Sequence, residues 1–121
     1  LLHAGHILML KEAKEVCDYL IVGLQVDPTA DRPTKNKPVQ SYYERWVQLS
    51  AVKYVDEIIP YTYESELMTI LQNYNINVRI LGSEYESKPF TGNYLNTDFH
   101  FNKRTHDYSS TELRNRIKSL E

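Results

Sequence analysis

Two histidines stand near the start of the chain, three residues apart, in the segment LLHAGHILML. His3 and His6 flank Gly5, and apolar residues at helical spacing follow them. If a helix begins near Gly5, both imidazoles lie at its N-terminus, where free backbone N–H groups and the helix dipole favour an anion. Gly5 lets a ligand approach the backbone closely, and imidazole N–H groups can donate to phosphate oxygens. The pattern indicates a phosphate-binding site.

His3 and His6 also have two plainer interpretations. One histidine can cap the helix while the other is a half-buried side chain with no ligand. Alternatively, H-x-x-H spacing can supply part of a metal site, but no third ligand is obvious in the sequence. The histidine pair alone does not decide between these possibilities.

A second candidate anion site lies in the segment KRTHDYSSTELR. Lys103 and Arg104 follow a short predicted strand, and a helix is expected to begin at three hydroxyl residues, Ser109, Ser110 and Thr111. Their hydroxyl and amide groups can cradle phosphates, and Arg114 follows one turn later on the same side. The plainer interpretation is an N-cap followed by a solvated amphipathic helix.

A third basic group, Lys35, Lys37 and Arg45, lies on and after a loop rich in proline and polar residues. By itself this group is typical of a solvated loop. Together with the two segments above, it makes three candidate anion sites in one small domain, which points to a polyphosphate ligand. The positions of these sites at strand ends fit the rule that ligands bind at the carboxyl ends of parallel strands.

The elements that must position these residues alternate between helix and strand. A capping box of Ser41 and Glu44 predicts the start of the second helix, and Pro60 is expected to stop the second strand. Two apolar runs are typical of strands buried on both faces. Helices are predicted over 6–17, 41–52, 65–75 and 109–121, and strands over 18–26, 55–60, 78–82 and 98–102, of which 18–26 and 78–82 are the buried ones.

This alternation predicts an α/β fold, with residues 1–121 forming a single Rossmann-like domain. Its sheet is expected to be mostly parallel, five-stranded and flanked by helices. Domains of this class normally start with a strand, so we expect the first strand to precede Leu1. The four strands predicted within the chain would then be the remaining ones.

Composition narrows the functional class. The chain has 121 residues, 41% of them hydrophobic and 25% charged, and its formal net charge is −2, which gives no long-range attraction to nucleic acid or to an anionic membrane. The single cysteine, Cys17, excludes an internal disulfide and a cysteine zinc cluster. No apolar run is long enough to cross a bilayer, and no signal peptide is visible, so we expect a cytoplasmic protein.

Two motifs resemble the signatures of the nucleotidyltransferase superfamily. LLHAGH resembles its H-x-G-H signature, and SSTELR resembles its second signature, in the same order and at a similar separation. Within that superfamily, the segments LLHAGHILMLKEAKEVCDYLIVGLQVD, YYERWVQLSAVKYVDEIIP and KRTHDYSSTEL look most like cytidylyltransferases of the glycerol-3-phosphate cytidylyltransferase type. The resemblance covers nearly the whole chain, and in that family the first strand lies at the centre of the sheet.

The resemblance implies roles for the residues near the two ends of the chain. His3 and His6 match the histidines that hold the nucleotide α-phosphate and stabilise its charge during transfer. Arg104 and Thr105 match the start of the second signature. The phosphate-binding turn of that signature is matched by Ser109, Ser110 and Thr111.

The resemblance also implies roles for residues in the middle of the chain. Lys37 lies close to a family lysine that neutralises phosphate, and Lys35 is its rival, because the register is uncertain there. Arg45 matches an arginine after the same loop, and Lys53 stands where close relatives carry arginine. Gly82 and Glu84, in LGSEYESK, match a loop near the base and ribose.

The implied reaction couples CTP to a phosphate monoester such as glycerol-3-phosphate, with Mg²⁺ carried on the nucleotide, in an enzyme that is expected to be a homodimer. No metal ligands can be named from the sequence. His106, Asp107 and Tyr108 replace the residues usual in the glycerol-3-phosphate enzymes. Arg114 makes the second signature resemble the S-S-T-x-x-R form that is common among adenylyltransferases. An adenylyltransferase using ATP and a non-catalytic nucleotide-binding domain are therefore the alternatives.

Overall fold

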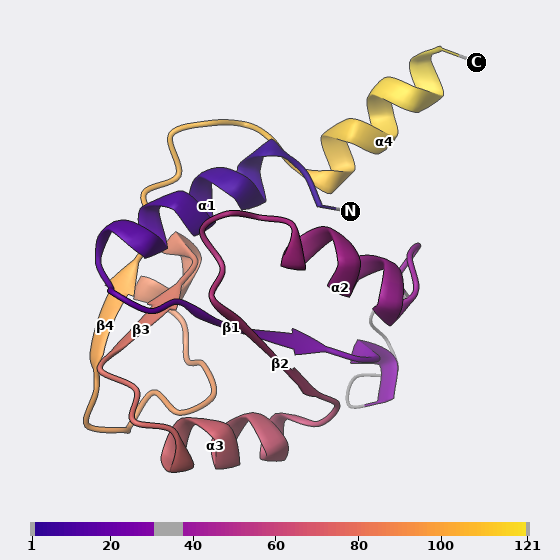
Figure 1. Ribbon diagram of the computed structural model, residues 1–121. Helices are drawn as coiled ribbons and strands as arrows, with labels where there is room; N and C mark the ends of the chain where they lie inside the picture. The colour runs from indigo at the N-terminus through magenta and orange to yellow at the C-terminus, as the bar shows by residue number, and fades with distance from the viewer. Residues whose placement is uncertain (1, 31–37, 121) are drawn as a thin grey trace.

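The protein has an α/β fold in which four helices accompany two pairs of parallel strands (Figure 1). The computed structural model describes residues 2–30 and 38–120. In chain order the elements are α1 (Ala4–Glu15), β1 (Ile21–Gln25), a 3₁₀ turn (Pro28–Ala30), α2 (Tyr42–Ser50), β2 (Glu57–Tyr61), α3 (Glu64–Asn73), β3 (Val78–Leu81), a second 3₁₀ turn (Ser83–Glu86), β4 (Asp98–Phe101) and α4 (Ser110–Ser119).

The strands form two sheets of two strands each within the described residues. β1 pairs with β2 from Ile21 opposite Glu57 to Gln25 opposite Tyr61, and β3 pairs with β4 in the same parallel sense. The α/β class and the parallel pairing are therefore confirmed. The single five-stranded sheet is not observed, since β1 and β3 have no strand partner other than β2 and β4 in the described part of the chain.

One small core joins the two sheets. Its buried residues come from α1, from α2 and from the position just before β1, and they are Leu10, Ala13, Leu20 and Leu49. Val22 of β1, Ile58 of β2 and Ile80 of β3 pack against this cluster. The expectation that the strands at 18–26 and 78–82 are buried on both faces is wrong, because no residue of β1 or β3 is buried. A strand in a two-stranded sheet keeps one open edge, which leaves its residues partly exposed.

Local signals place the helix starts correctly and one strand end incorrectly. Ser41 accepts from the Glu44 N–H at 3.1 Å and Glu44 accepts from the Ser41 N–H at 3.0 Å, which is the predicted capping box of α2. Pro60 does not stop β2 but lies inside it, opposite Leu24. Proline is tolerated there because β2 pairs with β1 alone among the described strands, so no second neighbour needs the missing N–H.

Polar contacts fix the position of α1 against both sheets. Lys14 pairs with Asp56 at 2.6 Å, and Asp56 also accepts from the Leu20 N–H at 2.7 Å. Two residues earlier in α1, Glu12 lies 2.6 Å from His100 Nε2 and accepts from the Lys103 N–H at 3.1 Å. No helix found in the described residues is long and apolar enough to span a membrane.

Candidate active site

A cavity of about 500 Å³ lies where the start of α1, the end of β3 and the segment between β4 and α4 meet. Segments far apart in the sequence supply its walls. The predicted site residues that it brings together are His3, Gly5, His6, Gly82, Glu84, Arg104, Thr105, Ser109 and Ser110. The two candidate anion sites at the ends of the chain are therefore one site.

The two histidines of the H-x-x-H segment form the cap of α1. The Nδ1 atom of His3 accepts from the Gly5 N–H at 3.0 Å, and the Nδ1 atom of His6 accepts from the His3 N–H at 3.3 Å. Their ring centroids lie 4.0 Å apart. Because Nδ1 is the acceptor in each ring, the proton of the neutral ring is on Nε2. Each histidine thus caps the helix and keeps one N–H donor.

Both histidines are neutral donors near pH 7. Burial, with a smaller contribution from the neighbouring His3, lowers the pKa of His6 to about 4. Burial is also the main cause that lowers the pKa of His3. The capping interpretation of His3 is therefore right, and it is compatible with phosphate binding, since capping uses Nδ1 and leaves Nε2–H for a ligand.

Gly5 is buried at the start of α1 between two imidazoles. A Cβ atom at this position would lie 2.8 Å from Cε1 of His3 and 2.8 Å from Cε1 of His106. Such contacts are shorter than real Cβ atoms show, so a side chain here would displace both rings. Glycine is therefore required for the close approach of these rings to the helix start.

The second signature lines the same cavity. Arg104 donates from Nε to the His106 carbonyl at 3.3 Å and from Nη2 to the Tyr108 carbonyl at 2.8 Å, which holds the loop before α4. Ser109 caps α4 by accepting from the Glu112 N–H at 3.0 Å. Thr111 and Arg114 follow in α4 but do not line the cavity.

Gly82 and Glu84 follow β3 directly and line the same cavity. A Cβ atom at Gly82 would lie 2.7 Å from Oε2 of Glu84, so the backbone at Gly82 lies close to this carboxylate. The strand end thus brings a carboxylate, which is a hydrogen-bond acceptor, to the cavity.

Arg45 and Lys53, two of the predicted basic residues in the middle of the chain, do not line this cavity. Arg45 donates from Nη1 to the Gln25 carbonyl at 2.7 Å and from Nη2 to the Val26 carbonyl at 2.6 Å, so it binds the backbone at the end of β1. The Lys53 ammonium lies 5.2 Å from the centre of the Tyr54 ring. Lys35 and Lys37 lie outside the described residues.

The cavity contains residues that sequence reasoning did not select. His106, Tyr108 and Glu12 line it, and so does Asn102, which is 7% exposed. Asn102 Nδ2 donates to the Met9 carbonyl at 3.4 Å, whereas its Oδ1 has no partner among the described residues. The sequence signals for His106 were its place beside a phosphate-binding motif and its departure, with Asp107 and Tyr108, from the residues usual in the enzymes that the chain resembles.

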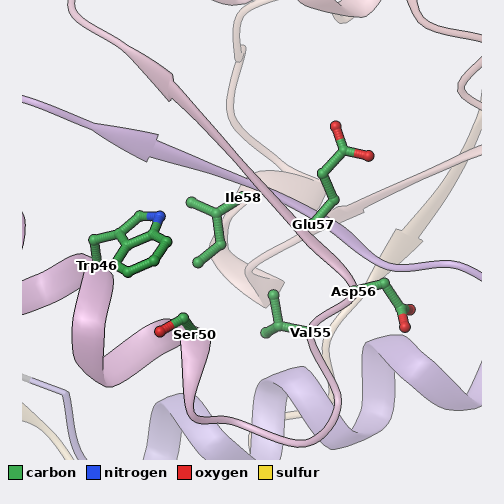
Figure 2. A pocket seen from close by; sticks show the side chains of 6 residues that line it. All are labelled: Trp46, Ser50, Val55, Asp56, Glu57 and Ile58. Carbon is green, nitrogen blue, oxygen red and sulfur yellow. The ribbon is translucent and has the colours of Figure 1, made fainter.

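A second, smaller pocket of about 190 Å³ lies between the end of α2 and the start of β2 (Figure 2). It is lined by Trp46, Ser50, Val55, Asp56, Glu57 and Ile58. Its charged groups are two carboxylates, which would repel a phosphate. The larger cavity is therefore the candidate active site.

The residues of the cavity do not form a dedicated metal cage. No group of three His, Cys, Asp or Glu side chains within 2–30 and 38–120 is arranged to hold a metal ion. Both carboxylate oxygens of Glu12 accept from the Lys103 N–H, and one also contacts His100.

Comparison with known proteins identifies the family of the chain. Residues 1–116 match the model of the family described as cytidylyltransferase-like. The chain is 32% identical over 120 residues to the glycerol-3-phosphate cytidylyltransferase of Bacillus subtilis (strain 168), covering 99% of this chain and 92% of the relative. It is 30% identical to that of Staphylococcus aureus (strain NCTC 8325 / PS 47), covering 97% of this chain and 87% of the relative.

A third relative matches over a shorter segment. The probable ethanolamine-phosphate cytidylyltransferase of Encephalitozoon cuniculi (strain GB-M1) is 46% identical over 70 residues, which is 56% of this chain and 22% of that protein. The family match spans both motifs that form the cavity, and two relatives match over nearly their whole length. The chain therefore belongs to the cytidylyltransferase-like family.

Proposed function

We propose that this protein is a nucleotidyltransferase that couples CTP to a phosphate monoester, giving a CDP-linked product and pyrophosphate. The observation that carries the proposal is the cavity in which the neutral Nε2–H donors of His3 and His6 meet Arg104 and the start of α4. The names of the relatives support glycerol-3-phosphate or a similar alcohol phosphate as the acceptor.

The chemistry needs charge stabilisation more than proton transfer. An oxygen of the acceptor phosphate forms a bond to the α-phosphorus of CTP, and the bond from that phosphorus to the bridging oxygen breaks. Pyrophosphate leaves with the electron pair. Near neutral pH the acceptor phosphate is already ionised, so no general base is required. His3 and His6, with lowered pKa values, act as hydrogen-bond donors to the α-phosphoryl group.

The remaining predicted residues divide between the leaving group and the nucleoside. Arg104, Ser109 and Ser110 line the side of the cavity at the start of α4, where they would hold pyrophosphate. Gly82 and Glu84 lie at the end of β3, where they would contact ribose and base. Lys37, or its rival Lys35, would neutralise phosphate from the loop that precedes α2. Mg²⁺ would enter as part of the nucleotide substrate.

The sheet and the assembly are part of the same proposal. A fifth strand placed between β1 and β3 would join the two observed pairs into one parallel sheet. A homodimer is supported by exposed aromatic residues of α2, where Tyr43 is 71% exposed and stacks on Trp46, a residue that lines the smaller pocket. Sedimentation analysis tests the dimer. A cytoplasmic location stays a prediction.

The test of the proposed function is pyrophosphate release. CTP and ATP are each offered with glycerol-3-phosphate, other polyol phosphates, phosphocholine, phosphoethanolamine and heptose-1-phosphate. Release with CTP and one alcohol phosphate is the expected result. Release with ATP alone would make the protein an adenylyltransferase. Nucleotide binding with no release from any pair would support a non-catalytic nucleotide-binding domain.

A further inference from the structure

We propose that His106 is a third imidazole that donates a hydrogen bond to the phosphoryl group bound at the start of α1, beside His3 and His6. The inference rests on the proposed nucleotidyl transfer, because it assigns a further catalytic residue to that reaction. In KRTHDYSST, His106 lies outside the H-x-x-H segment.

The first support is the position of the ring. His106 lines the same cavity as His3 and His6 although one hundred positions separate it from His6. The Cβ position of Gly5 lies 2.8 Å from Cε1 of His106 and 2.8 Å from Cε1 of His3. The two rings therefore converge on one point above the first turn of α1, where the free N–H groups of the helix favour an anion.

The second support is the orientation of the ring nitrogens. His106 Nδ1 accepts from the Tyr108 N–H at 3.1 Å, so the neutral ring carries its proton on Nε2, next to the Cε1 atom that approaches Gly5. His3 and His6 have the same arrangement, with Nδ1 bound to a backbone N–H. His3, His6 and His106 thus each keep an Nε2–H donor, and all three residues line one cavity.

The third support is that the protein fixes the ring before any ligand binds. His106 is half-buried and stacks on Tyr108, with ring centroids 5.0 Å apart and planes inclined by 22°. Arg104 holds the carbonyls of His106 and Tyr108, which fixes the loop on both sides of the ring. A donor that needs no rearrangement can stabilise the charge that develops during transfer.

The step leaves the proton balance of the reaction unchanged. The acceptor oxygen bonds to the α-phosphorus, the bond to the bridging oxygen breaks, and pyrophosphate leaves with the electron pair. His106 donates a hydrogen bond from Nε2 throughout and keeps its proton. A merely structural role would instead need only Nδ1, which accepts from Tyr108, and this difference can be tested.

Two variants separate the two ring nitrogens. His106→Asn keeps a short acceptor for the Tyr108 N–H but has no donor at the distance of Nε2. His106→Gln places an amide N–H near the position of Nε2. We expect kcat for pyrophosphate release to fall about 10-fold to 100-fold in His106→Asn, the range for losing a hydrogen bond to a charged group, and to fall less in His106→Gln. Asp107→Asn, an exposed neighbour outside the cavity lining, is the matched control.

The outcomes also separate this inference from the proposed function. If the unaltered protein releases pyrophosphate and His106→Asn does so equally fast, the role of His106 is wrong and the proposed function stands. If the unaltered protein binds CTP without turnover, the proposed function fails, and weaker CTP binding by His106→Asn than by His106→Gln supports the phosphate contact. Equal CTP affinities, or no CTP binding by the unaltered protein, would overturn it.

Discussion

The two helices that begin at the cavity, α1 and α4, are held in different ways. α1 buries Gly5, Leu10 and Ala13 and contributes to the core, whereas no residue of α4 is buried. Figure 1 shows α4 projecting away from the body of the protein toward the C-terminus, while α1 lies next to the β3–β4 pair. Ile117 and Leu120 at the far end of α4 are 57% and 86% exposed.

The first turns of the two helices are nevertheless capped by the same kind of hydrogen bond. In α1 the side chain of His3 accepts from a backbone N–H, and in α4 the side chain of Ser109 does so. Capping fixes a first turn locally, but only packing fixes its place relative to the rest of the protein. We infer that α1 supplies the rigid half of the site, and that α4 depends on the Arg104 loop for its position.

The largest expected effect comes from removing the Nε2–H donor of His6, which lies on α1. His6→Ala should lower kcat about 10²-fold to 10³-fold, the usual effect of losing one preorganised donor, and should leave the fold intact. Pyrophosphate release with CTP and the best acceptor measures kcat, and circular dichroism checks the fold.

His6→Asn is the control for capping in this experiment. Its amide oxygen can replace Nδ1 as acceptor for the His3 N–H, but it has no donor at the distance of Nε2. We expect it to lose nearly as much turnover as His6→Ala while keeping more of the stability. Near-normal turnover in either variant would show that His6 serves only as a cap.

The second prediction breaks the anchor of α1 far from the cavity. Asp56→Ala should lower the free energy of unfolding by about 2 kcal/mol, because it leaves the Leu20 N–H and the Lys14 ammonium without their common acceptor. Urea unfolding measures the change. Lys14→Met removes the partly exposed ion pair and the exposed hydrogen bond from Lys14 to the Asp18 carbonyl, and should cost less than about 1 kcal/mol. Equal costs for the two variants would contradict the importance of the Leu20 N–H.

Much of the fold could be predicted because its signals are local. The capping box at Ser41 and the cap at Ser109 mark helix starts within one residue of those observed. Burial and strand ends were predicted less well, since they depend on partners that are distant in sequence. Pro60 continues β2 because of where the strand lies in its sheet, and no local signal carries that information.

The site could be predicted in part for the same reason. Each phosphate-binding motif is a short segment, so His6 and Ser109 could be selected separately from the sequence, and the fold brings them to one cavity. Arg45 was selected for its charge, but its guanidinium binds two backbone carbonyls at the end of β1. His106 was not selected, because its significance depends on its approach to Gly5.

The third prediction concerns pH and compares the histidines of α1 with the carboxylates that anchor it. The pKa of His6 is lowered to about 4 in the folded protein, from an ordinary value of 6.5. Below pH 6.5 the unfolded chain therefore binds a proton that the folded protein takes up only near pH 4, so stability falls as pH falls through this window. The loss should be on the order of 1 kcal/mol, because solvent screening reduces it.

The carboxylates change the stability at lower pH values than His6 does. The contribution of His6 can therefore be measured separately. Hydrogen bonds from Leu20 N–H and Lys14 lower the pKa of Asp56, so its contribution is lost only below its ordinary value of 3.8. Thermal unfolding between pH 4.5 and 7 should therefore show a smaller slope in His6→Asn than in the unaltered protein. Identical slopes would mean that His6 is not buried as a neutral ring.

The smallest expected effect lies on the outer part of α4. Arg116 pairs with Glu112 at 2.6 Å across one turn, but both side chains are exposed, at 58% and 38%. Glu112→Gln should change the free energy of unfolding by less than about 0.5 kcal/mol, the usual range for an exposed pair on a helix. Urea unfolding measures it beside Ser109→Ala, which removes the cap and should cost about 1 kcal/mol.

This pair of variants tests whether α4 unfolds together with the rest of the protein. If α4 belongs to the same cooperative unit as α1, Ser109→Ala lowers the midpoint of urea unfolding seen by tryptophan fluorescence, since Trp46 lies in α2. If α4 is held only by its own cap and the Arg104 loop, amide hydrogen exchange in 110–119 accelerates while that midpoint stays fixed. The weak packing of α4 favours the second result, and a common shift of both measurements would place α4 with α1 in one cooperative unit.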